Sequence, residues 1–331
     1  MQDQVAALTT RGVAAACLNS TQGPDTQRAV KKALAAGRVR LLYVAPERLE
    51  SLAGTLNLVS LLAIDESHCI SEWGHEFRPA YRDLGRLRER LGMPPTLALT
   101  ATATPATRAD IVGVLGLTRP VHVVTSFDRP NLHLSARVLD SELDRLAALR
   151  HLLNHVDGTV VVYTPTRNRT DGVAAILGRW GYCAAPYHAG LPGEARSDLL
   201  TRFLTGGIRV MVATSAFGMG IDKADVRLVV HLGIPARPES YYQEAGRAGR
   251  DGKPARCELL WLRPDLEFHA RQSVAGVHEH RVALKAGRAV MRRYVLTRGC
   301  RRRVLLAYLG NPDARCAGCD NCTPNGSHNE R

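Results

Sequence analysis

Short apolar runs alternate with amphipathic stretches along most of the chain. Runs of β-branched and aliphatic residues predict strands, and longer stretches with apolar positions every three or four residues predict helices. The expected strands cover residues 41–45, 61–64, 97–100, 121–124, 160–163, 210–214, 226–232 and 258–262. The expected helices cover residues 25–36, 141–155, 171–180 and 194–204. This alternation is typical of repeated βαβ units, so we expect an α/β fold built on parallel sheets.

The pattern divides the chain into segments. Pro and Asn interrupt it within residues 126–131, so we expect two lobes, residues 1–126 and 127–263. No strand pattern follows Leu262, and residues 264–322 read as Arg-rich helices leading to a cluster of cysteines, which predicts a separate small module. Residues 323–331 are polar and rich in Pro, Gly, Ser and Asn, a composition typical of disorder.

Composition narrows the classes of partner. A chain of 331 residues with 45% hydrophobic content can bury the cores of two or three domains. The net charge of +13 favours an acidic polymer such as nucleic acid, because binding phosphates releases counterions, although a solvated basic face explains the same charge. Neither an uncharged apolar run of the roughly 18–20 residues that span a membrane nor a signal-peptide pattern is present. The sequence therefore predicts a cytoplasmic protein with no membrane partner.

Two adjacent carboxylates, Asp65 and Glu66, follow the apolar run at residues 61–64. Ligands bind just beyond the carboxyl ends of strands in open α/β sheets. One carboxylate there can hold Mg²⁺, and its neighbour can orient or deprotonate the water that attacks a γ-phosphate. Asp65 is expected in the first role and Glu66 in the second. A solvated Asp-Glu pair at a strand end is the alternative.

Two further segments favour phosphoryl chemistry. Residues 99–104, Leu-Thr-Ala-Thr-Ala-Thr, close a strand with hydroxyls, and residues 241–252 place Arg247 and Arg250 three positions apart. The two arginines are expected on one helical face, where a guanidinium can stabilise charge on a transferring phosphoryl group. In order, the carboxylate, hydroxyl and arginine segments resemble motifs II, III and VI of superfamily 2 helicases. The resemblance implies ATP as substrate, with His68 and Gln243 contributing to the nucleotide site.

Residues 67–81, Ser-His-Cys-Ile-Ser-Glu-Trp-Gly-His-Glu-Phe-Arg-Pro-Ala-Tyr, look like the aromatic-rich loop of RecQ helicases. Such a loop suits single-stranded DNA, because Trp73 and Phe77 can stack on bases while Arg78 meets phosphate or adds a cation–π contact. Aromatic residues buried in a lobe core are the alternative. The family usually reads Asp-Glu-Ala-His, and here Ser67 replaces the alanine, a change of one small residue for another.

The resemblance continues through the second lobe. Residues 160–171 resemble motif IV, where Thr164 is expected to contact the DNA backbone. Residues 212–223 resemble motif V, where Thr214 would meet phosphate and Asp222 would couple nucleotide state to DNA. Gly218-Met219-Gly220 is not the Gly-x-Gly-x-x-Gly of dinucleotide-binding folds. The family resemblance implies RecA-like lobes and 3′ to 5′ unwinding of DNA in recombination and repair, with single-stranded and branched or duplex DNA as partners.

Four of the eight cysteines, Cys300, Cys316, Cys319 and Cys322, crowd the C-terminal end, while the rest are scattered, which is not a disulfide framework. Four thiolates can surround a tetrahedral Zn²⁺, and iron–sulfur ligation is the rival. RecQ helicases carry a zinc site with this spacing after the second lobe, which implies a structural zinc. The neighbouring basic run is expected to meet phosphate, with a solvated helix face as the alternative; it contains Arg298, Arg301, Arg302 and Arg303.

One expected motif is missing from the 331 residues. A Gly-x-x-x-x-Gly-Lys-Ser/Thr loop would hold the β and γ phosphates, and Gly252-Lys253 does not supply it because Pro254 follows. Residues 1–5 resemble the helix after motif Ia, and no winged-helix domain follows Cys322. The expected architecture is therefore two RecA-like parallel-sheet lobes, the first incomplete, followed by a small helical zinc-binding module.

Two functional hypotheses follow from this architecture. In the first, the chain is an N-terminally truncated ATP-dependent DNA helicase with impaired ATP binding. In the second, it is an ATP-independent DNA-binding or annealing module, or a decayed remnant. A single-strand-binding protein or other repair partners cannot be read from the residues.

Overall fold

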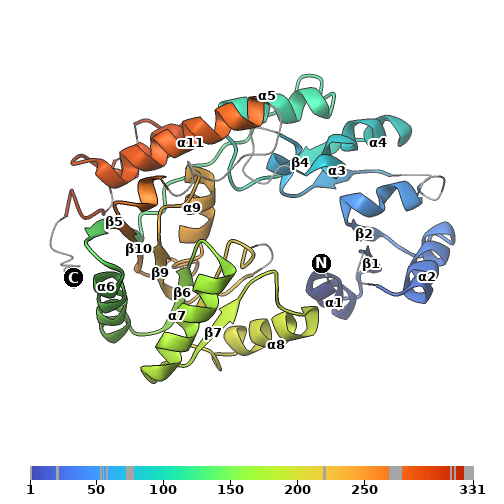
Figure 1. The fold of residues 1–331 in the computed structure, drawn as a ribbon. Helices are drawn as coiled ribbons and strands as arrows, with labels where there is room; N and C mark the ends of the chain where they lie inside the picture. Colours follow the sequence, from blue (N-terminus) through green and yellow to red (C-terminus); the bar gives the residue numbers. More distant parts are fainter. Residues whose placement is uncertain are drawn as a thin grey trace. The chain divides into compact units, whose positions relative to one another are not determined.

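The computed structural model of the chain contains two compact units, residues 1–123 and 124–331 (Figure 1). The residues that it describes are 2–19, 22–52, 54, 56, 59–71, 78–218, 221–267, 278–313, 315–316 and 318–323.

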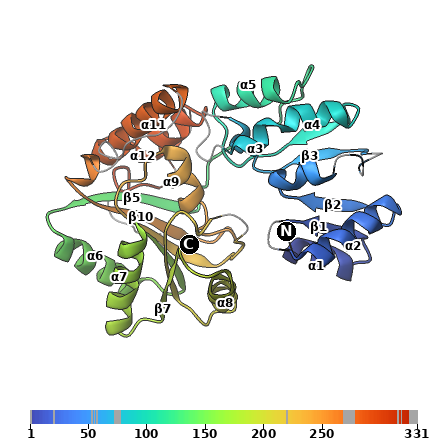
Figure 2. The same cartoon turned by 45° about the vertical axis from the view of Figure 1, so that its right-hand side comes forward.

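The strands of the first unit form two separate parallel pairs. β1 (Ala15–Leu18) pairs with β2 (Leu41–Val44), and β3 (Leu62–Ile64) pairs with β4 (Thr96–Ala98). Two helices lie beside the first pair, α1 (Gln2–Thr10) and α2 (Pro24–Ala35) (Figure 2). The remaining helices of the unit are η1 (Pro46–Leu52), η2 (Ser67–Ile70), α3 (Pro79–Arg82), α4 (Leu84–Arg90) and α5 (Pro105–Val114).

A small apolar core fixes the end of β3, where Asp65 and Glu66 follow. Its buried residues are Ile64, Ile70, Leu84, Leu87, Ile111 and Leu115. Helix α4 crosses α5 closely at Gly85, where a Cβ would lie 2.1 Å from the carbonyl oxygen of Val114. Thr104 caps α5, since its side chain accepts a hydrogen bond from the Thr107 amide.

The second unit is built on a six-stranded parallel sheet with the order β5-β10-β9-β6-β8-β7. Its strands are β5 (Leu132–Leu139), β6 (Thr159–Tyr163), β7 (Ala184–Tyr187), β8 (Val210–Ala213), β9 (Val226–Leu232) and β10 (Ala255–Leu262). Its helices are α6 (Glu142–His155), α7 (Arg167–Arg179), α8 (Gly193–Leu204), α9 (Pro238–Ala245), α11 (His278–Leu296) and α12 (Arg301–Tyr308).

Helices cover both faces of this sheet. Leu149 of α6 and Leu177 of α7 join one buried cluster, and Tyr241 of α9, Tyr294 of α11 and Leu305 of α12 join the other. The cysteine-rich segment (residues 300–323) therefore shares its core with the second lobe, whereas the sequence predicts a separate module. The described helices include none that is long and apolar enough to cross a membrane.

The cysteine-rich segment also covers the edge of the sheet. The Leu134 amide of edge strand β5 donates to the carbonyl of Gly318 at 3.3 Å, and the Asp320 amide donates to the carbonyl of Leu134 at 3.0 Å. The Ala136 amide donates to the Asp320 carboxylate at 3.1 Å. Backbone groups of an uncovered edge strand would otherwise face solvent or another chain.

The class of fold predicted from the sequence is confirmed, and most predicted strands and helices are present within a few residues of their expected bounds. The strand predicted at residues 121–124 is wrong. Val121 and Val123 are 90% and 84% exposed, and no described strand pairs with this segment. β-branched residues favour a strand only where a pleated surface lies against them.

Three strands are not predicted by the sequence pattern: β1, β5 and β7. β1 is a short run of small residues, and β7 contains Pro186. Proline is tolerated in β7 because this strand lies at the edge of the sheet.

Gly85→Ala is expected to destabilise the first unit by about 1–3 kcal/mol, because the new methyl group meets the backbone of α5. Gly113→Ala is the matched control, since its Cβ would meet nothing within 4 Å, and it should stabilise α5 by about 0.5–1 kcal/mol. Urea titration of both variants measures the difference. Equal effects would show that the α4–α5 contact is looser than described.

Candidate functional site

Asp65 and Glu66 lie in a turn at the carboxyl end of β3. Asp65 is exposed, and its Oδ1 accepts a hydrogen bond from the Glu66 amide at 2.8 Å. Glu66 has a left-handed backbone conformation, with φ 50° and ψ 41°, which costs a residue with a side chain about 1–2 kcal/mol. Backbone strain of this kind clusters at ligand-binding and catalytic sites.

His68 connects this turn to the end of β4. The imidazole is 1% exposed, and its Nδ1 lies 3.0 Å from Thr100 Oγ1 and 3.3 Å from Glu66 Oε2. The Thr100 hydroxyl donates to the carbonyl of Thr102 at 3.2 Å, so its oxygen is left to accept, and we assign the proton to Nδ1 of His68. The Glu66 carboxylate is therefore oriented by a buried histidine whose own position depends on Thr100.

Arg247 and Arg250 lie in a turn that follows α9, which we call the arginine loop (residues 246–250). The expectation that they share a helical face is wrong, because α9 ends at Ala245. Arg247 is buried, whereas Arg250 points outward and donates to Asp222 Oδ1 at 2.9 Å. Gln243 is half-buried within α9.

Arg247 packs between β6 and the loop after β8. Its Nη2 lies 3.3 Å from where a Cβ of Gly218 would be, so a side chain at that position would press on the guanidinium. Burial raises the pKa of Tyr163 above its ordinary value, against the partial lowering by Arg247 beside it. The phenol therefore stays protonated, and its O–H donates to the carbonyl of Phe217 at 2.8 Å.

A line of buried rings continues from Tyr163 to the helix before the cysteine-rich segment. Tyr163 stacks on His231 with 5.2 Å between ring centroids, and the Nε2 of His231 lies 2.8 Å from the Glu244 carboxylate. Tyr241 lies next to His231, and its hydroxyl is 2.8 Å from that of Tyr294 in α11. Helix α9, which precedes the arginine loop, is thus held from both sides.

The residues expected to bind DNA have different surroundings. Trp73 and Phe77 lie outside the described residues. Arg78 precedes α3, and its amide donates to the carbonyl of Cys69 at 3.0 Å. Thr164 is buried and its hydroxyl is 2.7 Å from that of Thr170, so it is used inside the lobe and not exposed to phosphate as the sequence predicts. Thr214 is half-buried, and its hydroxyl accepts from the Ala216 amide at 3.4 Å.

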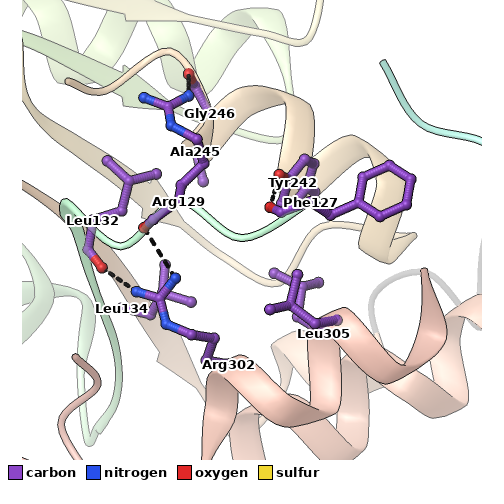
Figure 3. Close-up of a pocket in the computed structure, with 10 residues that line it drawn as sticks. Phe127, Arg129, Leu132, Leu134, Tyr242, Ala245, Gly246, Arg302 and Leu305 are labelled. Atoms are coloured by element: carbon purple, nitrogen blue, oxygen red, sulfur yellow. Dashed lines mark hydrogen bonds between the residues drawn. The ribbon is translucent and has the colours of Figure 1, made fainter. Parts of the chain in front are cut away.

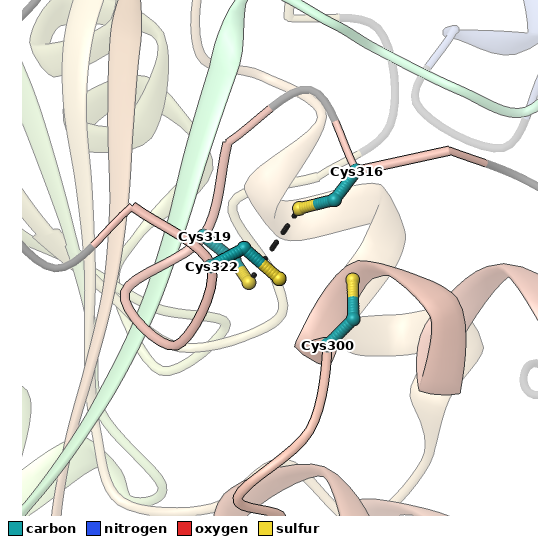
Figure 4. Close-up of side chains that lie close together, drawn as sticks. All are labelled: Cys300, Cys316, Cys319 and Cys322. Atoms are coloured by element: carbon teal, nitrogen blue, oxygen red, sulfur yellow. Dashed lines mark hydrogen bonds between the residues drawn. The ribbon is translucent and has the colours of Figure 1, made fainter.

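The four clustered cysteines converge on one point (Figure 4). The sulfur atoms of Cys300, Cys316, Cys319 and Cys322 all lie within 4.8 Å of one another. Four sulfurs at about 2.3 Å from a tetrahedral Zn²⁺ would be roughly 3.8 Å apart, so the arrangement fits that ion.

The cluster also connects to the fold around it. Cys300 caps α12, since its sulfur accepts from the Arg303 amide at 3.4 Å. Burial and the neighbouring Cys300 thiol raise the pKa of Cys316. A bound cation would offset the unfavourable free energy of deprotonating Cys316, because metal ligation favours the thiolate.

The basic run after Cys300 does not form one DNA-facing surface. Arg301 and Arg302 are only 5% and 3% exposed. Arg301 donates to the Asp320 carboxylate and to the carbonyls of Tyr294, Val295 and Ala136. Arg302 donates to the Asp128 carboxylate and to the carbonyls of Arg129, Leu132 and Gly318. The prediction of phosphate contacts from these two residues is therefore wrong, whereas Arg303 is exposed.

Comparison with known sequences divides the chain in the same order. Residues 1–111 match the DEAD/DEAH box helicase family, residues 144–252 match the helicase conserved C-terminal domain, and residues 265–323 match the RecQ zinc-binding family. The chain belongs to the RecQ-type helicases of superfamily 2.

Relatives of this RecQ-type chain are similar along almost all of its length. The ATP-dependent DNA helicase RecQ of Bacillus subtilis is 42% identical over 98% of the chain. The mouse bifunctional 3′-5′ exonuclease/ATP-dependent helicase WRN is 37% identical over 99% of it. The chain spans 56% of the first protein and 25% of the second.

A structural comparison supports the fold. The helicase Lhr of Mycobacterium smegmatis, solved with single-stranded DNA and AMP-PNP, matches 91% of the RecQ-type chain with a TM-score of 0.60 at 21% identity and is itself covered over 46%.

Sequence reasoning missed residues that act by position. The sequence assigns no individual role to Thr100, Tyr163 or Arg129, although each contacts a residue or loop to which it does assign one. Thr100 had a signal, since it lies in the hydroxyl-rich segment at residues 99–104. Arg129 had none, because its partners are 117 to 120 positions away along the chain.

Proposed function

We propose that the chain forms the hydrolytic and DNA-contacting core of an ATP-dependent 3′ to 5′ DNA helicase that acts in recombination and repair. The observation that carries the proposal is the Glu66–His68–Thr100 link at the carboxyl ends of β3 and β4 in a RecQ-type chain. Relatives of the chain are named ATP-dependent DNA helicases.

The residues of the first unit fit the hydrolytic step. The exposed Asp65 carboxylate would hold Mg²⁺, and Glu66 would orient the water that attacks the γ-phosphate. His68 lies within 3.3 Å of both the Glu66 carboxylate and the Thr100 hydroxyl, so it links the position of Glu66 to that of Thr100. Movement of Thr100 would therefore change the geometry at Glu66 without touching the nucleotide.

The residues of the second unit fit stabilisation of the developing phosphoryl charge. Arg250 is partly exposed and paired only at the surface with Asp222, so it can leave that carboxylate at small cost. Arg247 is buried beside Tyr163 and Gly218, a position that suits a preorganised cation. Gln243 lies in α9, four positions before Arg247, and would contact the nucleotide.

A polypeptide of these 331 residues is expected to show no DNA-stimulated ATP hydrolysis, because the sequence contains no loop to grip the β and γ phosphates. Joining it to an upstream segment with Gly-x-x-x-x-Gly-Lys-Ser/Thr should restore turnover, on the order of 1 s⁻¹ or more. Glu66→Gln in the longer protein should abolish turnover. Glu194→Gln, an exposed glutamate of α8, is the control and should leave it unchanged.

If the 331 residues alone hydrolyse ATP, and Glu66→Gln abolishes that hydrolysis, the requirement for an upstream loop is contradicted. Full turnover by Glu66→Gln in the longer protein would contradict the role of Glu66.

We propose that DNA contacts the exposed arginines around the cysteine cluster in place of the buried pair. Four arginines are exposed here: Arg292 and Arg293 near the end of α11, Arg298 between α11 and α12, and Arg303 in the first turn of α12. Within the described ranges, no ion pair joins any of these four to a carboxylate. This surface needs no nucleotide, so it also supports the second candidate function, ATP-independent DNA binding or annealing.

Arg298→Ala with Arg303→Ala should weaken binding to a labelled single-stranded oligonucleotide and flatten its salt dependence by about 0.7 for each phosphate that an arginine no longer neutralises. Arg86→Ala with Arg179→Ala removes the same formal charge from exposed sites on α4 and α7 and should leave the slope nearly unchanged. Salt titration of the three proteins separates local contact from net charge. Identical slopes in all three would refute the assignment of this surface.

We propose that the cysteine cluster holds one structural Zn²⁺. The fit of four sulfurs within 4.8 Å supports this ion, and its binding would join Cys300 to the segment that covers β5. Structural zinc contributes folding free energy directly, because the ligands are not preorganised in the unfolded chain.

Metal analysis of the purified protein should find one zinc per chain, and Cys316→Ser should lose both the metal and thermal stability. Cys183→Ser is the control, since Cys183 is exposed and lies outside the cluster, and it should retain the zinc. Iron with sulfide, or folded soluble protein without metal, would rule out the assignment.

A further inference from the structure

The carbonyl groups of the arginine loop are bound by one side chain from the start of the second unit. Arg129 donates from Nη1 to the carbonyl of Gly246 at 3.2 Å (Figure 3). From Nη2 it donates to the carbonyls of Ala248 and Gly249 at 3.1 and 2.8 Å. These carbonyls follow the C-terminal end of α9, where the helix leaves acceptors unpaired and a cation is favoured.

Asn131 completes the attachment of the loop. Its Nδ2 donates to the carbonyl of Gly249 at 2.8 Å and to that of Lys253 at 2.9 Å. Gly249 has φ +55°, and a Cβ there would lie 2.5 Å from Asn131 Nδ2 and 2.7 Å from the Lys253 oxygen. No residue other than glycine fits without displacing Asn131, so the loop and the 129–131 segment are matched in shape as well as in hydrogen bonding.

The 128–132 segment is held in turn by the cysteine-rich segment. Arg302 donates to the Asp128 carboxylate at 2.5 Å. It also donates to the carbonyl of Arg129 at 3.0 Å and to that of Leu132 (Figure 3). Arg302 lies in the first turn of α12, which begins at the capping sulfur of Cys300. Arg302 also donates to the carbonyl of Gly318, which lies between Cys316 and Cys319. Hydrogen bonds of Arg302 and Arg129 therefore connect the cysteine cluster to the arginine loop.

The side chains along this path are closely packed, so a displacement of one of them would move its neighbours. The seam between Phe127, Tyr242 and Leu305 leaves a cavity of only about 20 Å³, which is space for roughly one water molecule. The gap is too small for a ligand, and a shift of Arg302 would be passed to its neighbours instead of being absorbed.

We propose that Arg129 is a positioning residue for Arg247 and Arg250, and that Arg302 makes this position depend on the metal-bound state of the cysteine cluster. The catalytic consequence rests on the proposed function, in which the arginine loop stabilises the transferring phosphoryl group. Arg129 itself touches neither substrate nor metal. It fixes the carbonyls on either side of Arg247 and the carbonyl directly before Arg250.

Hydrogen exchange of the 331-residue protein tests the structural part without any need for ATP hydrolysis. In Arg129→Ala, amides of residues 246–253 should exchange about tenfold faster or more, because the variant lacks three hydrogen bonds from a charged donor. Arg209→Ala is a matched control. Arg209 also binds three backbone carbonyls, those of Leu153, Val156 and Gly158, so exchange should rise at 153–158 and stay unchanged at 246–253.

Two further samples test the path from the cysteine cluster. Arg302→Ala and protein depleted of zinc by a chelator should both accelerate exchange at 127–131 and at 246–253. Arg129→Lys keeps the charge but not the planar fork, so its loop should exchange faster than that of the wild type and more slowly than that of Arg129→Ala. Unchanged exchange at 246–253 in Arg129→Ala would overturn the positioning role. Unchanged exchange after zinc depletion would overturn the dependence on the cluster.

Steady-state kinetics of an ATP-hydrolysing form tests the catalytic part. Arg129→Ala should lower kcat about tenfold with little change in the KM for ATP, since only a stabilisation of the transition state is disturbed. Added methylguanidinium should raise the kcat of Arg129→Ala part of the way back to the wild-type value. A misfolded variant would not respond in this way. Arg209→Ala should have the same kcat as the wild type. If Arg250→Ala abolishes hydrolysis and Arg129→Ala does not change kcat, the proposal fails. If loop exchange responds to Arg129→Ala but Arg250→Ala hydrolyses ATP normally, the loop attachment stands and the proposed function fails.

Discussion

The structure of the second unit depends on two buried arginines whose N–H groups need hydrogen-bond acceptors within the protein. A guanidinium withdrawn from water is costly unless carboxylates or carbonyls replace the missing solvent. Arg301 donates hydrogen bonds to the Asp320 carboxylate and to backbone carbonyls of α11 and β5. Arg302 donates to the Asp128 carboxylate and to the carbonyl at the start of β5. These partners come from the start of the unit, the sheet edge and the cysteine-rich segment. Satisfying two cations therefore brings together parts of the chain that are far apart in the sequence.

The same constraint explains why the cysteine-rich segment has no core of its own. It is a short stretch with few large apolar residues, and below about 40 residues a domain usually needs help from metals or from a neighbour. Here it has both a metal-binding cluster and the face of the sheet, where Leu305 and Cys319 are buried with the lobe. A variant that loosens this segment would therefore disturb the lobe as well.

Much of the architecture could be predicted from the sequence because the signals are local. The apolar run before Asp65, the hydroxyls near Thr100 and the spacing of the four cysteines each lie within a short stretch of chain. The predictions failed where the outcome depended on distant partners. A basic run reads as a solvated or DNA-binding face whatever its surroundings, and only the carbonyls of β5 and the Asp128 carboxylate reveal why Arg301 and Arg302 are buried. The roles of Trp73 and Phe77 remain predictions.

The segment that covers the edge of β5 also affects whether the protein stays in solution. The residues that satisfy this edge, Gly318 and Asp320, lie within the loop that the metal would close. If zinc closes this loop as proposed, a chain without it would also expose the edge of β5 to strand addition by another molecule. Scarcity of zinc would then remove this protein from solution by aggregation, and a defect that began at a metal site would be observed as a shortage of the protein itself.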